Sequence, residues 1–259
     1  MEALLQVDGI SKVFGGLSAL SDVRFSVGRG EIVGLIGPNG AGKTTAFNVI
    51  SGTHPPTTGT VRFKGVEITG GPPSRVVRLG LARTFQATSI YPAVSVEENI
   101  YRGAIGAVDT GLFNQLINGT NTREAIARAR ENVEGVFDIM GLAPFRHTQA
   151  GGLSYGYQKR LGVAVALATK PELLLLDEPA AGLNPEESAE FGRLLRKLRS
   201  DMNLTLLLVE HHMALVMDLC ERIVVLVQGE MIAEGSPGEV RENPLVIEAY
   251  LGAPEYAHA

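Results

Sequence analysis

The chain has 259 residues, a formal net charge of −5 and a single cysteine. Hydrophobic residues make up 45% of it and charged residues 20%, a balance that fits a globular protein with a sizeable core and excludes a disordered chain. The negative charge argues against a general nucleic-acid binder, so we expect no nucleic-acid partner. One cysteine excludes an internal disulfide and favours a reducing cytoplasm, with Cys220 as a packed thiol.

Neither a signal peptide nor a membrane span is expected. The N-terminus, MEALLQVDGI, lacks a basic region followed by an apolar core. The longest apolar runs are of strand length, far below the roughly 20 residues that span a bilayer. We therefore expect a cytoplasmic chain that would reach a membrane only through a partner.

The N-terminal part is expected to form a small antiparallel sheet. Glycine-rich turns separate five strand-like runs: Leu4–Val7, Val23–Val27, Ile32–Ile36, Thr60–Phe63 and Val66–Ile68. Phe14 stands just ahead of a glycine pair, where an aromatic ring could stack on a base. Taken alone, such an aromatic is more often part of a core.

Residues 30–50, GEIVGLIGPNGAGKTTAFNVI, combine an apolar strand, a glycine-rich loop and a helix. The loop matches G-x-x-x-x-G-K-[ST], the pattern of a phosphate cradle formed by backbone N–H groups and a helix N-terminus. Lys43 would reach the outer phosphates and the Thr44 hydroxyl would bind Mg²⁺. The predicted cradle consists of Gly37, Pro38, Asn39, Gly40, Ala41, Gly42, Lys43, Thr44 and Thr45.

The pattern becomes mostly helical after an expected strand at Gly80–Gln86. Apolar residues recur on one face of Thr122–Met140, and this spacing predicts a helix there. A Gly-, Asn- and Thr-rich loop is expected at Gly103–Asn121. We expect residues 88–165 to form a helical subdomain inserted into a core made of residues 1–87 and 166–259, all within one domain.

Strands and helices alternate again from Pro171 onwards. The expected strands and helices are Leu173–Leu176, Glu186–Arg199, Leu204–Val209, a helix from Met213, Ile223–Val227, and two short helices in Ser236–Leu251. This alternation predicts an α/β fold with a mostly parallel sheet. The all-leucine run is typical of a strand that is covered on both faces.

Two acids follow that leucine run in LLLLDEP. They would lie at the carboxyl edge of the sheet, where open α/β folds bind their ligands. Asp177 could hold the Mg²⁺ that Thr44 contacts, and Glu178 could orient or deprotonate an attacking water. Two acids capping a turn before Pro179 would explain the polarity but not the pairing with a phosphate loop.

The string LSYGYQ, which starts at Leu153, decides between classes of nucleotide hydrolase. It resembles the LSGGQ signature of ATP-binding cassette (ABC) ATPases, and the resemblance covers nearly the whole chain. Tyr155 replaces the first signature glycine and Tyr157 stands at the usual glutamine. Ser154 and Gly156, which the resemblance places against the γ-phosphate, are intact. A P-loop kinase or GTPase would lack this string.

The resemblance implies further roles. Gln86 would be the glutamine that senses Mg²⁺ and touches a transmembrane partner, and His211 would contact the γ-phosphate. Phe14 would stack on adenine. Asn184 occupies a position where the family often has aspartate.

In this family ATP is sandwiched between the cradle of one protomer and the signature of another. The resemblance therefore implies ATP and Mg²⁺ as cofactors and a second ABC ATPase, identical or related, as a partner. It also implies transmembrane permease subunits, an indirect substrate-binding protein, and a peripheral location on the inner face of the cell membrane.

Six strings resemble importers of branched-chain amino acids: VFGGLSAL, ARTFQ, SVEENI, LSYG, DEPAAGLNP and NPLVIEAYLG. Val165 departs from this resemblance, because relatives typically have arginine there. The strings indicate the type of subunit better than its cargo. Importers of urea, amides or aromatic acids stay open, as does a non-transport ABC ATPase such as an iron–sulfur assembly factor.

Overall fold

A six-stranded sheet runs through the middle of the molecule in the order β10-β9-β3-β8-β7-β6. The computed structural model describes residues 3–84, 90–106 and 120–251. All strand pairs in this sheet are parallel except β10 with β9. The strands are β3 (Ile32–Ile36), β6 (Leu81–Arg83), β7 (Leu173–Asp177), β8 (Thr205–Val209), β9 (Arg222–Val227) and β10 (Glu230–Gly235).

The predicted α/β fold with a mostly parallel sheet is confirmed, but β10 was not predicted. Its sequence, EMIAEG, shows only weak alternation of polar and apolar residues, and none of its residues is buried, because the strand lies at the edge of the sheet. A hairpin at Gln228 and Gly229, both with positive φ, turns the chain back along β9.

The second sheet is the predicted antiparallel one, with the order β2-β1-β4-β5. The run Ile32–Ile36, grouped with its strands above, belongs to the central sheet instead. The first two strands of the antiparallel sheet are longer than expected because irregular pairing lets each continue past its apolar run. Gly9, with a φ of 64°, marks one such shift. The strands are β1 (Ala3–Phe14), β2 (Leu17–Gly28), β4 (Thr58–Phe63) and β5 (Val66–Glu67).

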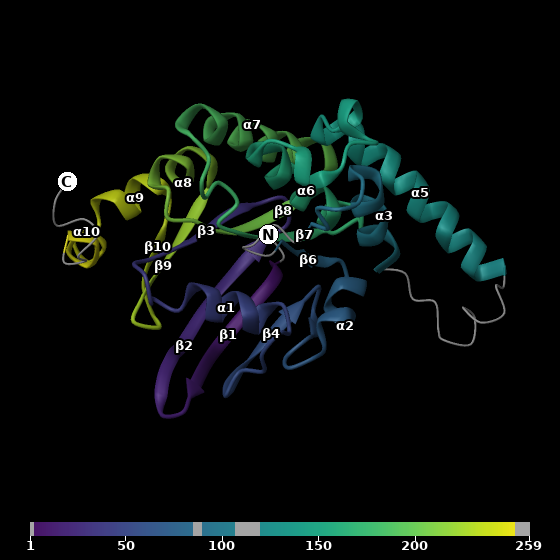
Figure 1. Cartoon of the computed structure of the whole chain (residues 1–259). Helices are drawn as coiled ribbons and strands as arrows, with labels where there is room; N and C mark the ends of the chain where they lie inside the picture. Colours follow the sequence, from purple (N-terminus) through teal and green to yellow (C-terminus); the bar gives the residue numbers. More distant parts are fainter. Residues whose placement is uncertain (1–2, 85–89, 107–119, 252–259) are drawn as a thin grey trace.

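The leucine run of β7 shows why the central strands have continuously apolar sequences. Leu174 and Leu176 enter one core, whereas Leu173 and Leu175 enter another on the opposite face. Successive side chains of a strand point to opposite faces, so both faces need apolar cover. In Figure 1 the helical layer lies on one face, and α1 with the antiparallel sheet lies on the other.

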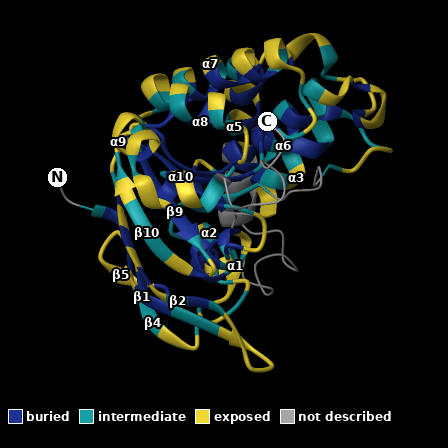
Figure 2. Ribbon diagram, turned by 90° about the vertical axis from the view of Figure 1, so that its left-hand side faces the viewer, coloured by how far each residue is buried: buried dark blue, intermediate teal, exposed yellow. Residues whose placement is uncertain are grey.

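Most helices follow the expected order, but the one at Pro73–Arg78 was not predicted. Helices also cover both ends of the loop expected at Gly103–Asn121, whose residues 107–119 lie outside the described residues. The helices before β7 are α1 (Lys43–Ile50), α2 (Pro73–Arg78), α3 (Val96–Gly106), α5 (Thr120–Met140), the 3₁₀ turns η1 (Ala143–Phe145) and η2 (Ala150–Gly152), and α6 (Tyr155–Leu167). Those after it are α7 (Pro185–Met202), α8 (Met213–Leu219), α9 (Pro237–Glu242) and α10 (Pro244–Leu251). Figure 2 shows that α7 is exposed on its outer side. The boundaries of the helical insertion at 88 and 165 stay a prediction.

Over the residues that the structure describes, no helix combines the length and the apolar character that crossing a membrane requires.

Cys220 lies buried at the end of α8, as expected of a packed thiol. Its sulfur packs over Gly34 of β3, where an added Cβ would be 3.0 Å from Sγ. Burial raises the pKa of the thiol from 9.0 to about 12. The folded chain therefore holds this proton more tightly than the unfolded chain does.

We predict that a thiol reagent at pH 8 leaves Cys220 unmodified in the native protein and modifies it fully in denaturant. Because the folded pKa is the higher one, the free energy of unfolding should fall as the pH rises from about 9 towards 12. Rapid stoichiometric labelling of the native protein would contradict the burial.

Candidate nucleotide site

The carboxyl ends of three central strands bring the predicted site residues to one edge of the sheet. The register pairs Leu35 of β3 and Asp177 of β7 with the same residue of β8, Val209. The cradle begins directly after β3, Glu178 directly after β7, and Glu210 directly after β8. These loops therefore meet at the edge where open α/β folds bind ligands.

The cradle is held by its lysine and by the neighbouring hairpin. Lys43, only 7% exposed, donates from Nζ to the carbonyl oxygens of Gly37 at 2.7 Å and Pro38 at 3.0 Å. The N–H of Gly229 donates to the carbonyl of Ala41 at 3.0 Å. A Cβ added at Gly37, whose φ is 150°, would lie 2.0 Å from the carbonyl oxygen of Leu226. Only glycine fits there.

The pocket at the cradle has a volume of about 720 Å³, within the range of small-molecule sites. It brings Glu178 together with most of the predicted cradle. Gly37 and Pro38 do not line it and instead hold Lys43. The lining consists of Leu17, Ser18, Ala19, Asn39, Gly40, Ala41, Gly42, Lys43, Thr44, Thr45, Glu178 and Gln228.

The expected base-stacking residue, Phe14, is not part of that lining. Its ring is 43% exposed and meets the ring of His54 edge-on, with 5.9 Å between centroids. Lys12 lies over the Phe14 ring, with Nζ 4.9 Å from the centroid. Leu17, three residues further on and 71% exposed, lines the pocket instead. The role of Phe14 stays a prediction.

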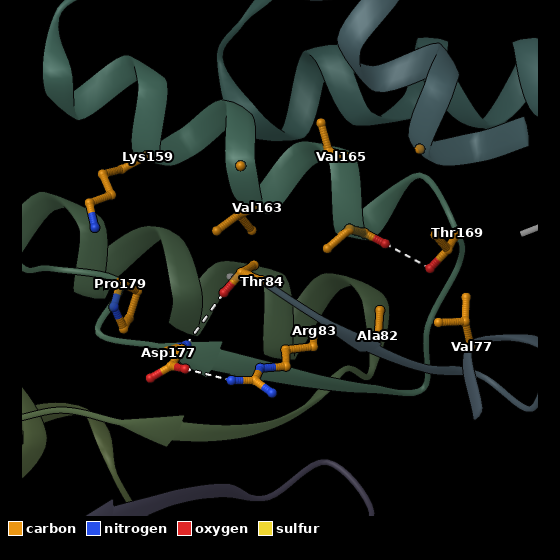
Figure 3. A pocket seen from close by; sticks show the side chains of 13 residues that line it. Val77, Ala82, Arg83, Thr84, Lys159, Val163, Val165, Thr169, Asp177 and Pro179 are labelled. Atoms are coloured by element: carbon orange, nitrogen blue, oxygen red, sulfur yellow. Dashed lines mark hydrogen bonds and ion pairs between the residues drawn. The ribbon is translucent and has the colours of Figure 1, made fainter. Parts of the chain in front are cut away.

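Asp177 lies deeper and pairs with Arg83, which the sequence analysis did not select. The two side chains are 1% and 8% exposed, and 2.8 Å separates Oδ2 from the guanidinium. Arg83 also donates to Asn48 Oδ1 at 2.7 Å, which ties β6 to α1. In Figure 3 this ion pair forms the floor of a second, mostly apolar cavity under α6.

The donor set can be tested against Mg²⁺. The second carboxylate oxygen of Asp177, Oδ1, is buried and has no hydrogen-bond partner among the described residues. An unpartnered carboxylate oxygen and a hydroxyl such as that of Thr44 are ligands that Mg²⁺ takes, with phosphate oxygens and water completing its shell. The two residues fit the metal. The third expected ligand, Gln86, lies outside the described residues.

Glu178 and His211 come together from adjacent strands. Oε1 of Glu178 is 3.7 Å from Nδ1 of His211, with the side chains 24% and 53% exposed. Glu178 has a φ of 48°, a left-handed conformation that is rare outside glycine. The turn is stabilised because the Glu178 N–H donates to the carbonyl of Val209 at 2.9 Å. The Glu178 side chain lines the cradle pocket, whereas Asp177 lines the cavity under α6.

Glu210 is a buried acid that the sequence analysis missed. Its side chain is fully buried, and Oε1 accepts the N–H of Ala180 at 2.7 Å. Oε2 accepts the N–H groups of His211 at 3.1 Å and His212 at 3.3 Å. One carboxylate thus fixes the loops that carry Glu178 and His211. The sequence does contain an indication of this role: like Asp177, Glu210 is an acid at the end of an apolar strand.

The signature residues lie at the start of α6, apart from the cradle pocket. Ser154 is the exposed N-cap, and Gly156 faces a groove towards Leu183 and Glu187. Tyr155 packs over Gly182, where a Cβ would lie 2.8 Å from its ring. Ser154 and Gly156 are absent from the cradle lining, so within one chain the structure does not bring these two halves together.

The departures from the family pattern have local explanations. Tyr157 packs on Phe145, with 4.4 Å between ring centroids. Asn184 caps α7 in a reciprocal capping box with Glu187, at 2.9 and 3.0 Å. Val165 lines the cavity of Figure 3 and packs against Gly103, where a Cβ would lie 2.4 Å from the Val165 carbonyl oxygen.

Comparison with known proteins identifies the family. The family described as ABC transporter matches residues 20–181, and the one described as branched-chain amino acid ATP-binding cassette transporter matches residues 230–256. The chain belongs to the ATP-binding cassette family. It is thus an ATPase cassette in which ATP hydrolysis is coupled to transport. The resemblance inferred from the motifs is confirmed.

Individual relatives are similar to this chain over nearly its full length. The high-affinity branched-chain amino acid transport ATP-binding protein LivG of Escherichia coli K12 is 43% identical, over 97% of this chain and 98% of LivG. The ADP conformation of MJ1267, a cassette of an ABC transporter, has a TM-score of 0.84 and 31% identity, covering 97% and 100%. The dimeric cassette MJ0796 has a TM-score of 0.73 and 25% identity, covering 90% and 98%.

We predict that Glu210→Ala lowers the free energy of unfolding by about 3 kcal/mol or more, because it leaves one buried and two partly buried N–H groups without an acceptor. ATPase activity should fall as well, since two loops of the site lose their common anchor. Denaturant titration and a steady-state ATPase assay measure the two effects. Glu242→Ala, at an exposed site on α9, is the control and should be neutral within about 0.5 kcal/mol. Equal stability of both variants would contradict the anchoring role.

Proposed function

We propose that the cassette binds Mg²⁺–ATP in the cradle pocket and that Glu178 is the general base for ATP hydrolysis. The proposal depends mainly on one observation: Glu178 lines the same pocket as Lys43 and Thr44, with His211 beside it at 3.7 Å. Polyphosphate would lie on the N–H groups of the loop from Asn39 to Thr45 and on the N-terminus of α1. Lys43 would neutralise charge on the outer phosphates.

Thr44 and Asp177 would hold Mg²⁺, with Gln86 as the further ligand that the family resemblance implies. A bound Mg²⁺ would screen the negative charge of the phosphates. The Arg83 guanidinium fixes Asp177 through Oδ2, so the unpartnered Oδ1 is held in one place before any ligand arrives. Such preorganisation avoids an ordering cost at the moment of binding.

Glu178 would accept a hydrogen bond from the attacking water and take its proton as the water oxygen bonds to the γ-phosphorus. The bond from that phosphorus to the oxygen shared with the β-phosphate breaks, so ADP leaves with the electron pair and inorganic phosphate forms. His211 lies within reach of the same carboxylate and would contact the γ-phosphate. Glu210 holds both loops by backbone N–H groups, so neither side chain depends on its own loop alone for its position.

The ATP held by a second cassette would be contacted by Ser154, Tyr155 and Gly156. Within one chain they lie outside the cradle pocket, and Ser154 is exposed at the N-terminus of α6. A helix N-terminus favours the negative γ-phosphate. The dimeric structure of the related cassette MJ0796 supports this arrangement. The second cassette could be a copy of this chain or a related ATPase.

We predict that Glu178→Gln keeps ATP binding but accumulates an ATP-sandwiched dimer, because the bound ATP is no longer cleaved. Light scattering with and without ATP measures the mass. Lys43→Ala in the same background is the control and should remain monomeric, since it loses the charge that neutralises the phosphates. A variant that stays monomeric at saturating ATP would count against the composite site.

The cassette would energise a membrane importer of branched-chain amino acids, as a peripheral subunit on the cytoplasmic side. The support comes from the name and 43% identity of LivG and from the match over residues 230–256. The binding of cargo would fall to permease subunits and a substrate-binding protein. Importers of urea, amides or aromatic acids, and a non-transport ABC ATPase, are the alternatives.

We predict that the cassette co-purifies with a detergent-solubilised permease encoded beside it. In reconstituted vesicles, the binding protein loaded with leucine, isoleucine or valine should stimulate ATP hydrolysis. The same binding protein with urea or an aromatic acid is the control and should give no stimulation. Stimulation by one of those alone would reassign the cargo, and failure of any permease to bind would contradict an importer.

A further inference from the structure

Lys159 is a buried ammonium group that the proposed hydrolysis does not use. The residue lies on α6, one helical turn after Tyr155, and is 9% exposed. Its Nζ donates to the backbone carbonyl of Glu178 at 3.2 Å. The Tyr155 ring lies below the same ammonium, 5.5 Å from its centroid. In Figure 3 the Lys159 side chain descends from α6 towards the segment that carries Asp177 and Pro179.

The position of Lys159 is costly without partners. Among the described residues no carboxylate lies within 4.0 Å of its Nζ. A buried cation must be compensated by hydrogen bonds or by an aromatic face. The Glu178 carbonyl and the Tyr155 ring supply these, and a hydrogen bond from a charged donor is stronger than one between neutral groups. Lys159 is therefore fixed to both.

Glu178 depends on this contact more than an ordinary residue would. Its left-handed φ of 48° is strained for a residue with a Cβ and persists only when surrounding groups hold it. The Glu178 N–H is held by Val209 of β8 at 2.9 Å. On the other side its carbonyl accepts from Lys159 at 3.2 Å and from the N–H of Ala181 at 3.2 Å. A movement of α6 would therefore act directly on this peptide.

We infer that Lys159 is a positioning residue that couples the signature end of α6 to Glu178 of the same chain. The inference rests on the proposed composite site. Ser154 and Tyr155 would meet the ATP held by the partner cassette, while Glu178 acts on the ATP in its own cradle. Closure of one ATP site would thus orient the carboxylate of the other, and ATP hydrolysis would be cooperative between the two sites.

The contrasting interpretation is that Lys159 merely packs α6 against β7. The two interpretations differ in what its removal changes. Loss of packing would lower stability and ATP-driven dimerisation. Loss of positioning would lower kcat while binding of ATP, and therefore KM, stays nearly constant.

The test compares Lys159→Met, Lys159→Arg and Lys197→Met. Methionine keeps most of the length of the side chain without its charge, arginine restores a donor, and Lys197 is an exposed lysine on α7. For Lys159→Met we expect kcat to fall by about 10- to 100-fold, the loss that a slightly misplaced catalytic group gives. KM for ATP should stay within about twofold and the Hill coefficient should approach 1. Arginine should restore part of kcat, and Lys197→Met should match the wild type.

Two further measurements separate this inference from its alternatives. In a Glu178→Ala background, Lys159→Met should cause no further loss, because a residue that acts through Glu178 has nothing left to position. In the Glu178→Gln background, the ATP-driven dimer should form with or without Lys159→Met. An additive loss, a weakened dimer or an unchanged kcat would overturn the role of Lys159. Absence of the dimer in Glu178→Gln itself would overturn the composite site, and the coupling with it.

Discussion

The parallel register of β3, β8 and β7 is the constraint on which the rest of the structure depends. Val209 of β8 is paired with Leu35 on one side and Asp177 on the other. A shift of one residue in either pairing would turn every side chain of a strand to the opposite face. Residues of each core would then lie on the wrong side of the sheet. The shift would also move the acids of β7 away from the cradle. Stability and the geometry of the site therefore depend on the same register.

Buried charged side chains then hold the loops that follow these strands in fixed positions. Arg83 and Asp177 join β6 to β7, and Glu210 joins the loops after β7 and β8 through backbone N–H groups. Each group carries a desolvation cost that its hydrogen bonds must offset, so each tolerates few alternative loop conformations. This arrangement explains how side chains on irregular backbone, such as Glu178 with its positive φ, stay aimed at one pocket.

Features set by local sequence could be predicted, and features set by distant backbone atoms could not. The cradle follows from glycine spacing, and β7 from four consecutive leucines. Lys159 was missed because it acts through a main-chain group 19 residues away, which leaves no pattern in the sequence. Glu210 has the pattern of an acid after an apolar strand, but its contact with the N–H of Ala180, 30 residues away, could not be predicted. Leu17 was missed for a related reason: it is paired with Phe14 across β1 and β2, and only the tertiary structure shows which of the two lines the pocket.

The concealed thiol of Cys220 has a practical consequence. Because the chain has no other cysteine, a cysteine introduced at an exposed position would be the sole accessible thiol of the folded protein. A fluorophore or spin label could be attached there without first removing the native residue and its packing against Gly34. The distance between two cassettes could then be followed in the native sequence background while ATP is bound and cleaved.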